Sequence, residues 1–308
     1  MSRVKPAASS EGERRSLYEE ITGQIIAELE AGRIPWVQPW GRIEDGPSLG
    51  MPLNAATGRR YSGINILILW GAVFARGYAS QAWLTFRQAQ ALGGSVRRGE
   101  RGITVVYADR FTPQEERRRA SEGGDEARSI AFLKRFTVFS VEQCDGLPDE
   151  LIAPAPTAEV SSILPEVEAV IRRSCADMRL GGDRAFYAPT LDYIQVPRPE
   201  AFFDPVNWHR TALHELGHWS GASHRLARDL TGPFGSVQYA REELVAEMSA
   251  AFTCASLGVT PTVRHADYIG DWLQVLRDDD RAIVRAASAA SKAADYLLAF
   301  REGTDGRA

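Results

Sequence analysis

Two histidines and a glutamate in one short stretch carry the sharpest chemical signal in the sequence. The stretch from Thr211 to Trp219 contains the pattern H-E-x-x-H, formed by His214, Glu215 and His218. Residues four apart on a helix share a face, so the two imidazoles can bind one metal ion. Zinc held by such nitrogen ligands lowers the pKa of a bound water to about 7, and a neighbouring glutamate can take the proton. We therefore predict a metal site at His214 and His218, with Glu215 as general base.

The distribution of histidines argues against a chance match. The chain has five histidines, and four of them lie within residues 209–224. The flanking residues Ala212, Leu213, Leu216 and Trp219 are apolar, as a buried helix requires. A metal site of this kind can be catalytic or only structural, and the pattern alone leaves both roles open.

Two candidates compete to supply the third ligand. His224 completes the spacing H-E-x-x-H-x-x-G-x-x-H around Gly221, which uses a third histidine and a methionine-bearing turn. The only downstream methionine, Met248, lies in a segment that is predicted to be helical. In that segment Glu243 and Glu247 are four apart and share a face. We favour Glu243 as the ligand and Glu247 as the residue that holds a ligand histidine by its other ring nitrogen, with His224 as the alternative.

Composition limits the class of protein. The chain has 308 residues, 44% hydrophobic and 25% charged, which is typical of a soluble globular protein with one large or two ordinary domains. The three cysteines are scattered and form neither a zinc spacing nor a disulfide framework, which indicates a reducing compartment. We find no apolar stretch long enough for a membrane span and no signal core, so we expect a cytoplasmic protein without a membrane partner.

A basic segment suggests a nucleic-acid contact, although the formal net charge is −4. Residues 59–110 contain eight arginines and two acidic residues, and Pro-Trp pairs occur in the loop just before them. Aromatic side chains with nearby arginines can stack on unpaired bases, but the tryptophans could equally fill the core. Residues 97–102, ahead of a β-branched run, predict a hairpin with a cationic tip. The candidate DNA-binding residues are Trp36, Trp40, Arg59, Arg60, Tyr61, Trp83, Arg87, Arg97, Arg98 and Arg101.

Helical periods and composition shifts divide the chain. Residues 1–15 are predicted to be a disordered lead-in, and Ser16 with Glu19 forms the capping box of a first helix. Residues 16–150 form the predicted DNA-binding domain and residues 151–158, rich in proline, a linker. Residues 159–308 form the predicted metal-binding domain. The expected fold class is α+β, with a mixed α/β N-terminal domain and an α+β C-terminal domain.

Several distinctive motifs are spread over nearly the whole chain. They are Ile34-Pro-Trp36, Tyr61-Ser-Gly-Ile-Asn65, Trp83-Leu-Thr-Phe-Arg-Gln-Ala-Gln90, Val141-Glu-Gln-Cys-Asp-Gly-Leu147, His214-Glu-Leu-Gly-His-Trp219 and Glu242-Glu-Leu-Val-Ala-Glu247. In this combination the chain resembles the ArdC-type antirestriction proteins of conjugative plasmids. It is also similar to the N-terminal region of the plasmid primases related to them.

The resemblance implies a single-stranded-DNA-binding N-terminal domain and a zincin-like metallopeptidase C-terminal domain. It implies a role in protecting incoming plasmid DNA from host restriction during conjugation. The family's metal pattern maps onto His214, Glu215 and His218, and Glu243 fits the third position, whereas several relatives have a serine where this chain has His224. The expected cofactor is Zn²⁺, with Mn²⁺ or another divalent ion as alternatives. The expected partners are single-stranded DNA and an unidentified protein substrate, for which the host restriction machinery is one candidate.

Two other functions remain open at this point. The first is a DNA-binding protein whose metal only orders the C-terminal domain, without physiological proteolysis. The second is a toxin-like peptidase whose basic segment recognises an acidic protein. A salt titration distinguishes the toxin-like peptidase from a DNA-binding protein, because the affinity for DNA phosphates falls steeply with ionic strength.

Overall fold

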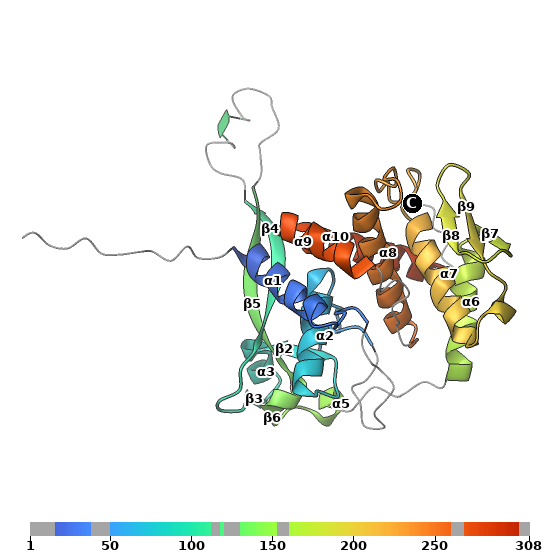
Figure 1. The fold of residues 1–308 in the computed structure, drawn as a ribbon. Coiled ribbons are helices and arrows are strands. Elements are labelled where there is room, and N and C mark those ends of the chain that lie inside the picture. The colour runs from blue at the N-terminus through green and yellow to red at the C-terminus, as the bar shows by residue number, and fades with distance from the viewer. Residues whose placement is uncertain are drawn as a thin grey trace, which may run out of the picture.

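The computed structural model describes residues 16–37, 50–111, 118–119, 130–152, 160–259 and 268–301 (Figure 1). For residues 108–111, 130–133 and 160–164 it describes the backbone alone. The predicted lead-in, Trp40 and residues 153–158 of the predicted linker lie outside the described residues. No helix in the described ranges has the length and apolar character that crossing a bilayer requires.

The N-terminal unit is built on a mixed four-stranded sheet with the order β1-β2-β5-β4. The pair β1–β2 is parallel, and the other two pairs are antiparallel. The strands are β1 (Leu53–Asn54), β2 (Ala82–Thr85), β4 (Ile103–Phe111) and β5 (Ile130–Ser140). The helices are α1 (Leu17–Glu30), α2 (Ile64–Arg76), α3 (Phe86–Ala91), η1 (Val141–Gln143) and α5 (Asp149–Ile152).

The first helix begins where its capping box predicts. The Ser16 hydroxyl accepts a hydrogen bond from the Glu19 backbone N–H at 3.1 Å, and the Glu19 carboxylate accepts one from the Ser16 N–H at 2.8 Å. These bonds satisfy two backbone donors that a helix start leaves without partners. The helix buries Ile21, Ile25 and Leu29, which recur at its period.

The predicted hairpin around residues 97–102 is wrong, because its two strands belong to different sheets. β3 (Ser95–Val96) pairs with β6 (Cys144–Asp145), whereas β4 pairs along its length with β5. The connecting segment is held by the Arg97 N–H, which donates to the Gln143 carbonyl at 2.9 Å. At its end, a Cβ on Gly102 would lie 2.4 Å from the Thr137 side chain, so this glycine allows the segment to run against β5.

The C-terminal unit places helices against a small three-stranded sheet. The sheet has the order β7-β9-β8, with β7 parallel and β8 antiparallel to β9. Apolar residues of β9 and of the helix that follows it, such as Ile194 and Leu213, form one buried cluster. The elements are α6 (Val160–Arg173), β7 (Asp177–Leu180), β8 (Phe186–Ala188), β9 (Tyr193–Val196), η2 (Pro199–Ala201) and α7 (Pro205–Trp219).

Three later helices lie between the N-terminal elements and the α6–α7 unit (Figure 1). They are α8 (Val237–Ser256), α9 (Ile269–Asp278) and α10 (Ala282–Leu298), followed by η4 (Ala299–Arg301). Their apolar side chains join those of α1, α2 and the N-terminal sheet in a single buried cluster. The rings of Trp70 on α2 and Phe252 on α8, for example, lie 5.7 Å apart. The predicted two-domain α+β architecture is confirmed. The helices α8, α9 and α10 pack against the N-terminal elements in one core, while α6, α7 and the small sheet belong to a second buried cluster.

Candidate metal centre

Helix α7 presents two histidines on one face. Its N-cap is Asp204, whose side chain accepts a hydrogen bond from the Val206 N–H at 3.2 Å, and proline occupies the first turn, where no donor is lost. The rings of His214 and His218 lie 4.9 Å apart, one helical turn from each other. Both imidazoles are largely withdrawn from solvent, with His214 2% exposed.

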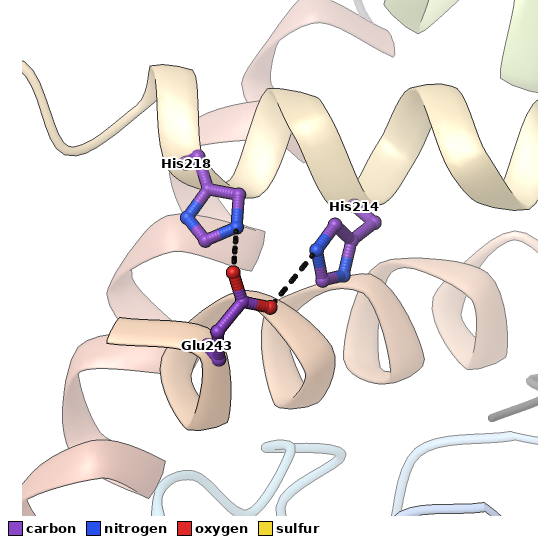
Figure 2. A group of neighbouring side chains, drawn as sticks. All are labelled: His214, His218 and Glu243. Atoms are coloured by element: carbon purple, nitrogen blue, oxygen red, sulfur yellow. Dashed lines mark ion pairs between the residues drawn. The ribbon is translucent and has the colours of Figure 1, made fainter. Parts of the chain in front are cut away.

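Helix α8 supplies a carboxylate between these two rings (Figure 2). The Nε2 atom of His214 lies 3.6 Å from one oxygen of Glu243, and Nε2 of His218 lies 3.4 Å from the other. Each of the three residues offers one ligand atom, and these atoms lie within 4.8 Å of one another. The structure thus brings together the three residues that the sequence predicts as ligands.

A glycine lets the two helices approach closely enough for this geometry. A Cβ on Gly217 of α7 would lie 2.4 Å from the Ser249 hydroxyl and 3.4 Å from the Ala246 Cα on α8. Real Cβ atoms essentially never come within 3.0 Å of another heavy atom, so a methyl group at this position would displace the buried Ser249 side chain. Gly217 therefore leaves the space in which Ser249 of α8 packs against α7.

The donor set fits a divalent ion. Two imidazole nitrogens and one carboxylate oxygen form a ligand triad used by catalytic zinc sites, and the same donor types accept manganese. The remaining ring nitrogen of each histidine also faces a carboxylate. Nδ1 of His214 lies 3.7 Å from Glu247, and Nδ1 of His218 lies 3.2 Å from Glu242. Glu247 therefore lies beside the second ring nitrogen of His214, at a distance longer than a hydrogen bond, and its role in orienting the imidazole stays a prediction.

Glu242 is the residue of this group that sequence reasoning missed. The helical spacing of Glu243 and Glu247 selects one face of α8, and Glu242 is displaced from that face by one residue. Its carboxylate reaches the other side of His218 and pairs with Arg228, which lies in the loop after α7. The one signal in the sequence was the Glu-Glu pair itself, and it did not indicate which histidine either acid would meet.

The charges of the group shift the pKa values of its members. Burial opposes the charged form of Glu243, but the neighbouring imidazoles of His214 and His218 outweigh it and hold the Glu243 pKa far below its ordinary value. Burial also opposes protonation of His218, but its interactions with Glu242 and Glu243 hold the His218 pKa well above its ordinary value of 6.5. The carboxylate therefore carries the negative charge that a cation requires.

Glu215 and Tyr239 add polar groups beside the ligands. Glu215 follows His214 on α7 and is 4% exposed. The Tyr239 hydroxyl lies 3.3 Å from that of Tyr268. Burial, followed by Tyr268 and Glu243, raises the pKa of Tyr239, so the phenol stays protonated and can donate a hydrogen bond.

His224, the alternative third ligand, lies in a different cluster. It is not part of the converging group found among the described residues, and its side chain is 61% exposed. Its Nε2 atom lies 3.4 Å from the Asp192 carboxylate, which also pairs with the buried Arg225. The loop after α7 therefore directs His224 toward the end of the small sheet, and Met248 lies inside α8 with no turn around it.

The structure corrects two of the predicted DNA-binding residues. Trp36 and Trp83 are fully buried, so neither ring presents a face on which a base could stack. Trp36 packs edge-on against Trp272 of α9 at 5.3 Å, and Trp83 packs against Tyr78 at 5.9 Å. The alternative given by the sequence for the tryptophans of the Pro-Trp loop, a place in the core, holds for Trp36, and Trp83 is a core residue as well.

The predicted basic residues lie on the surface of the N-terminal unit, and Tyr61 beside them is partly buried. The exposed arginines are Arg59, Arg60, Arg87, Arg97, Arg98 and Arg101. Arg97 already pairs with Glu100 at 2.8 Å, so part of its charge is balanced. Sequence reasoning missed three exposed aromatic side chains in the same unit, Phe86, Tyr107 and Phe136.

Two family models match the chain one after the other. A model described as the N-terminal domain of anti-restriction factor ArdC matches residues 15–139. A model described as a zincin-like metallopeptidase matches residues 165–289, a range that contains His214, His218 and Glu243.

Two relatives show how far the similarity extends. The y4eC protein of Sinorhizobium fredii (strain NBRC 101917 / NGR234) is 42% identical in an alignment 295 positions long that covers 92% of each chain. A DNA primase TraC of Escherichia coli is 39% identical in an alignment 305 positions long that covers 94% of this chain. The match covers 28% of that primase, so the chain spans little more than a quarter of its length.

Solved structures of one protein share the fold. The metal-free crystal structure of the antirestriction protein ArdC from plasmid R388 matches with a TM-score of 0.78 at 38% identity, over 94% of this chain and 100% of that one. Its Mn(II)-bound structure matches over the same shares with a TM-score of 0.77 at 37% identity. The similarity therefore covers nearly the whole chain and includes a relative that binds a divalent ion.

Proposed function

The chain belongs to the family of ArdC antirestriction proteins, and from that premise we propose that it binds single-stranded DNA and hydrolyses a protein at its metal centre. We assign DNA binding to residues 16–150 and hydrolysis to residues 159–308. The proposed role is protection of plasmid DNA that enters a new host cytoplasm during conjugation. The host restriction machinery is one candidate for the protein substrate.

The convergence of His214, His218 and Glu243 carries the proposal of an enzyme. A divalent ion held by these residues, zinc or manganese, would supply a Lewis acid and lower the pKa of a water molecule. In the proposed mechanism Glu215, the residue after His214, would accept the proton of the attacking water and transfer it to the leaving amide nitrogen. The protonated Tyr239 hydroxyl, near Glu243, can donate a hydrogen bond to the carbonyl oxygen as its negative charge develops.

An edge strand near this helix offers a way to bind an extended peptide. The order β7-β9-β8 leaves β8 at the edge of the small sheet, and β8 packs beside α7. A peptide that adds to such an edge is recognised by its backbone, so it can be cleaved without a strict sequence preference. A protein substrate with an exposed, extended segment fits this surface.

The β4–β5 ladder supports the proposed DNA contact with exposed aromatic side chains. Tyr107 lies opposite Lys134 and Phe136 lies opposite Val105, so the two aromatics are diagonal neighbours on one face. They are 61% and 47% exposed. Stacking contributes roughly 1–3 kcal/mol per base and depends little on the base, which suits non-specific binding of unpaired DNA. The exposed arginines named above would contact phosphates.

One observation favours a second function, in which the metal is structural. The three ligands connect α7 to α8, and the opposite side of α8 contributes to the core shared with the N-terminal unit. An ion there would therefore also fix the two units against each other. In that case DNA binding alone would provide the protection, and a protein unable to hydrolyse peptides would keep its biological effect.

Fluorescence anisotropy of a labelled single-stranded oligonucleotide tests the DNA-binding part. The whole chain is used, because a fragment without α8 to α10 would lose part of the shared core. We expect tight binding that unlabelled duplex displaces poorly, and a log–log salt slope of about −0.7 per phosphate contact. The double variant Tyr107→Ala/Phe136→Ala should weaken binding by at least ~30-fold, from the stacking energies of two bases.

The control is Phe203→Ala, which removes a fully exposed aromatic ring from the C-terminal unit and should leave binding unchanged. Absence of wild-type binding, or binding insensitive to salt, would contradict the proposed function. If the double variant bound DNA as tightly as the wild type, Tyr107 and Phe136 would not be contact residues, but the proposal of DNA binding would not be contradicted.

A further inference from the structure

We propose that Glu242 and Arg228 form a positioning pair that holds His218 in the orientation required to bind the metal. The inference rests on the proposed metal centre and does not depend on peptide hydrolysis. Glu242 contacts His218 on the side of the ring that faces away from Glu243. Nδ1 of His218 lies 3.2 Å from the Glu242 carboxylate, and the two side chains are 13% and 11% exposed.

Arg228 fixes the Glu242 carboxylate through two parallel hydrogen bonds. Its Nε donates to one oxygen at 3.0 Å, and its Nη2 donates to the other at 2.7 Å. This fork geometry restricts the carboxylate in distance and in angle, which a lysine ammonium cannot do. Because the Arg228 side chain is also only 11% exposed, the pair is shielded from competing water.

The same guanidinium ties the carboxylate to the last turn of α7. Nη2 of Arg228 donates to the Gly217 carbonyl at 2.6 Å, and Nη1 donates to the Ser220 hydroxyl at 3.0 Å. Both acceptors lie within two residues of His218. Through Arg228, the carboxylate of Glu242 on α8 is therefore held in a fixed position relative to α7, the helix that carries His218.

A carboxylate held in this way determines which ring nitrogen of His218 is available to the metal. Glu242 is an acceptor only, so the proton of the neutral imidazole is kept on Nδ1 and the lone pair on Nε2. Nε2 is the atom that faces Glu243. His214 has a looser arrangement, in which Nδ1 lies 3.7 Å from Glu247. Partners of this kind typically change metal affinity by 10–100-fold when they are removed.

Gly221 has a function in this arrangement that the histidine spacing did not predict. A Cβ at Gly221 would lie 2.7 Å from Nη2 of Arg228 and 3.0 Å from the His218 carbonyl. The Gly221 carbonyl also accepts a hydrogen bond from the Arg228 N–H at 2.8 Å. The glycine of the H-E-x-x-H-x-x-G pattern therefore makes room for the guanidinium, whereas His224 lies elsewhere.

The test compares zinc affinity with stability in matched variants. Dissociation constants for Zn²⁺ are measured by competition with a chelator, and urea unfolding is followed on the metal-free proteins. We expect Glu242→Ala to weaken zinc binding by about 10–100-fold and Arg228→Lys by about 10-fold. Glu242→Gln should restore part of the affinity, because its side-chain oxygen still accepts from Nδ1–H.

Arg225→Lys is the control from the same loop. Arg225 is as buried as Arg228 and also pairs with a carboxylate, that of Asp192, but it does not contact His218. It should reduce stability and leave the zinc affinity within about three-fold. Unchanged affinity in Glu242→Ala and Arg228→Lys would overturn the inference. Wild-type affinity in His218→Ala, or no zinc binding by the wild type, would instead reject the metal centre.

A second measurement uses the wild-type protein alone, so it tests the inference even if the variants fail to fold. Nitrogen-15 NMR of the zinc-loaded protein identifies the tautomer of each ligand histidine. We expect a slowly exchanging Nδ1–H for His218. A proton on Nε2, with the metal on Nδ1, would contradict the assignment of Glu242.

Discussion

Phe252 tests whether the metal-bearing helix and the N-terminal unit share one core. Phe252 lies on α8, the helix of Glu243, and is fully buried. Its ring meets that of Trp70 on α2 at 5.7 Å and an interplanar angle of 70°, an edge-to-face arrangement. Such pairs contribute about 0.5–1.5 kcal/mol beyond the area that they bury.

Phe252→Ala should lower the free energy of unfolding by about 3–5 kcal/mol, the range for a buried phenylalanine that leaves a cavity. The loss of stability should affect both units, because the cavity opens between α8 and α2. A loss of about 4 kcal/mol corresponds to roughly a thousand-fold faster exchange of amides that exchange by global unfolding. Phe252→Leu keeps most of the volume and should cost less than about 1.5 kcal/mol.

Hydrogen exchange measured by mass spectrometry separates the two units. We expect peptides from α2 and from α7 to lose protection by a similar factor in Phe252→Ala. If α2 kept wild-type protection while α7 lost it, the two units would unfold independently. The contacts between α8 and α2 would then not couple the stabilities of the two units.

Four further predictions concern the metal centre. Glu215→Ala should retain one metal ion per chain by elemental analysis and lower peptide hydrolysis by about 10²–10⁴-fold; persistence of antirestriction in this variant would show that hydrolysis is not the function. Tyr239→Phe should lower the rate of hydrolysis by about 10²–10³-fold with unchanged metal affinity, and a normal rate would exclude its hydroxyl as a donor. Burial opposes protonation of His218, but Glu242 and Glu243 hold its pKa above 6.5, so a metal ion must displace a proton to bind. The metal affinity measured by calorimetry should therefore rise with pH up to that raised pKa and then level off. An affinity that does not change with pH above 6.5 would contradict this prediction. Gly217→Ala should lower the free energy of unfolding measured in urea by about 1–3 kcal/mol and weaken metal binding, because its Cβ would meet Ser249. The control Gly23→Ala, where the Cβ has open space, should not lower the stability of the protein.

The grouping of the candidate metal ligands was predictable from sequence because helical spacing determines which side chains share a face. His214 and His218 on one helix, and Glu243 and Glu247 on another, needed only a spacing of four. The approach of the two helices was not predictable, because it depends on the space that Gly217 leaves. Glu242 was missed for a related reason: its partner, Arg228, comes from a loop whose path the periodicity does not describe.

The N-terminal surface was predicted less well. A tryptophan has the same chemistry whether it stacks on a base or fills a core, and the burial of Trp36 depends on α9, far away in the sequence. The shared core was also invisible, since α8 is buried along most of its length and shows no apolar stripe that would indicate one partner. Tyr107 and Phe136 became identifiable only with the register of β4 and β5.

Anomalous diffraction from crystals of the manganese-loaded protein would show whether α7 and α8 bind one metal ion between them. We predict one strong anomalous peak between α7 and α8, bonded to Nε2 of His214, Nε2 of His218 and the Glu243 carboxylate. Zinc in the same crystals should lie at about 2.0–2.2 Å from these atoms. A peak at His224 and Asp192, or loaded crystals without a peak at Glu243, would contradict the metal centre described above.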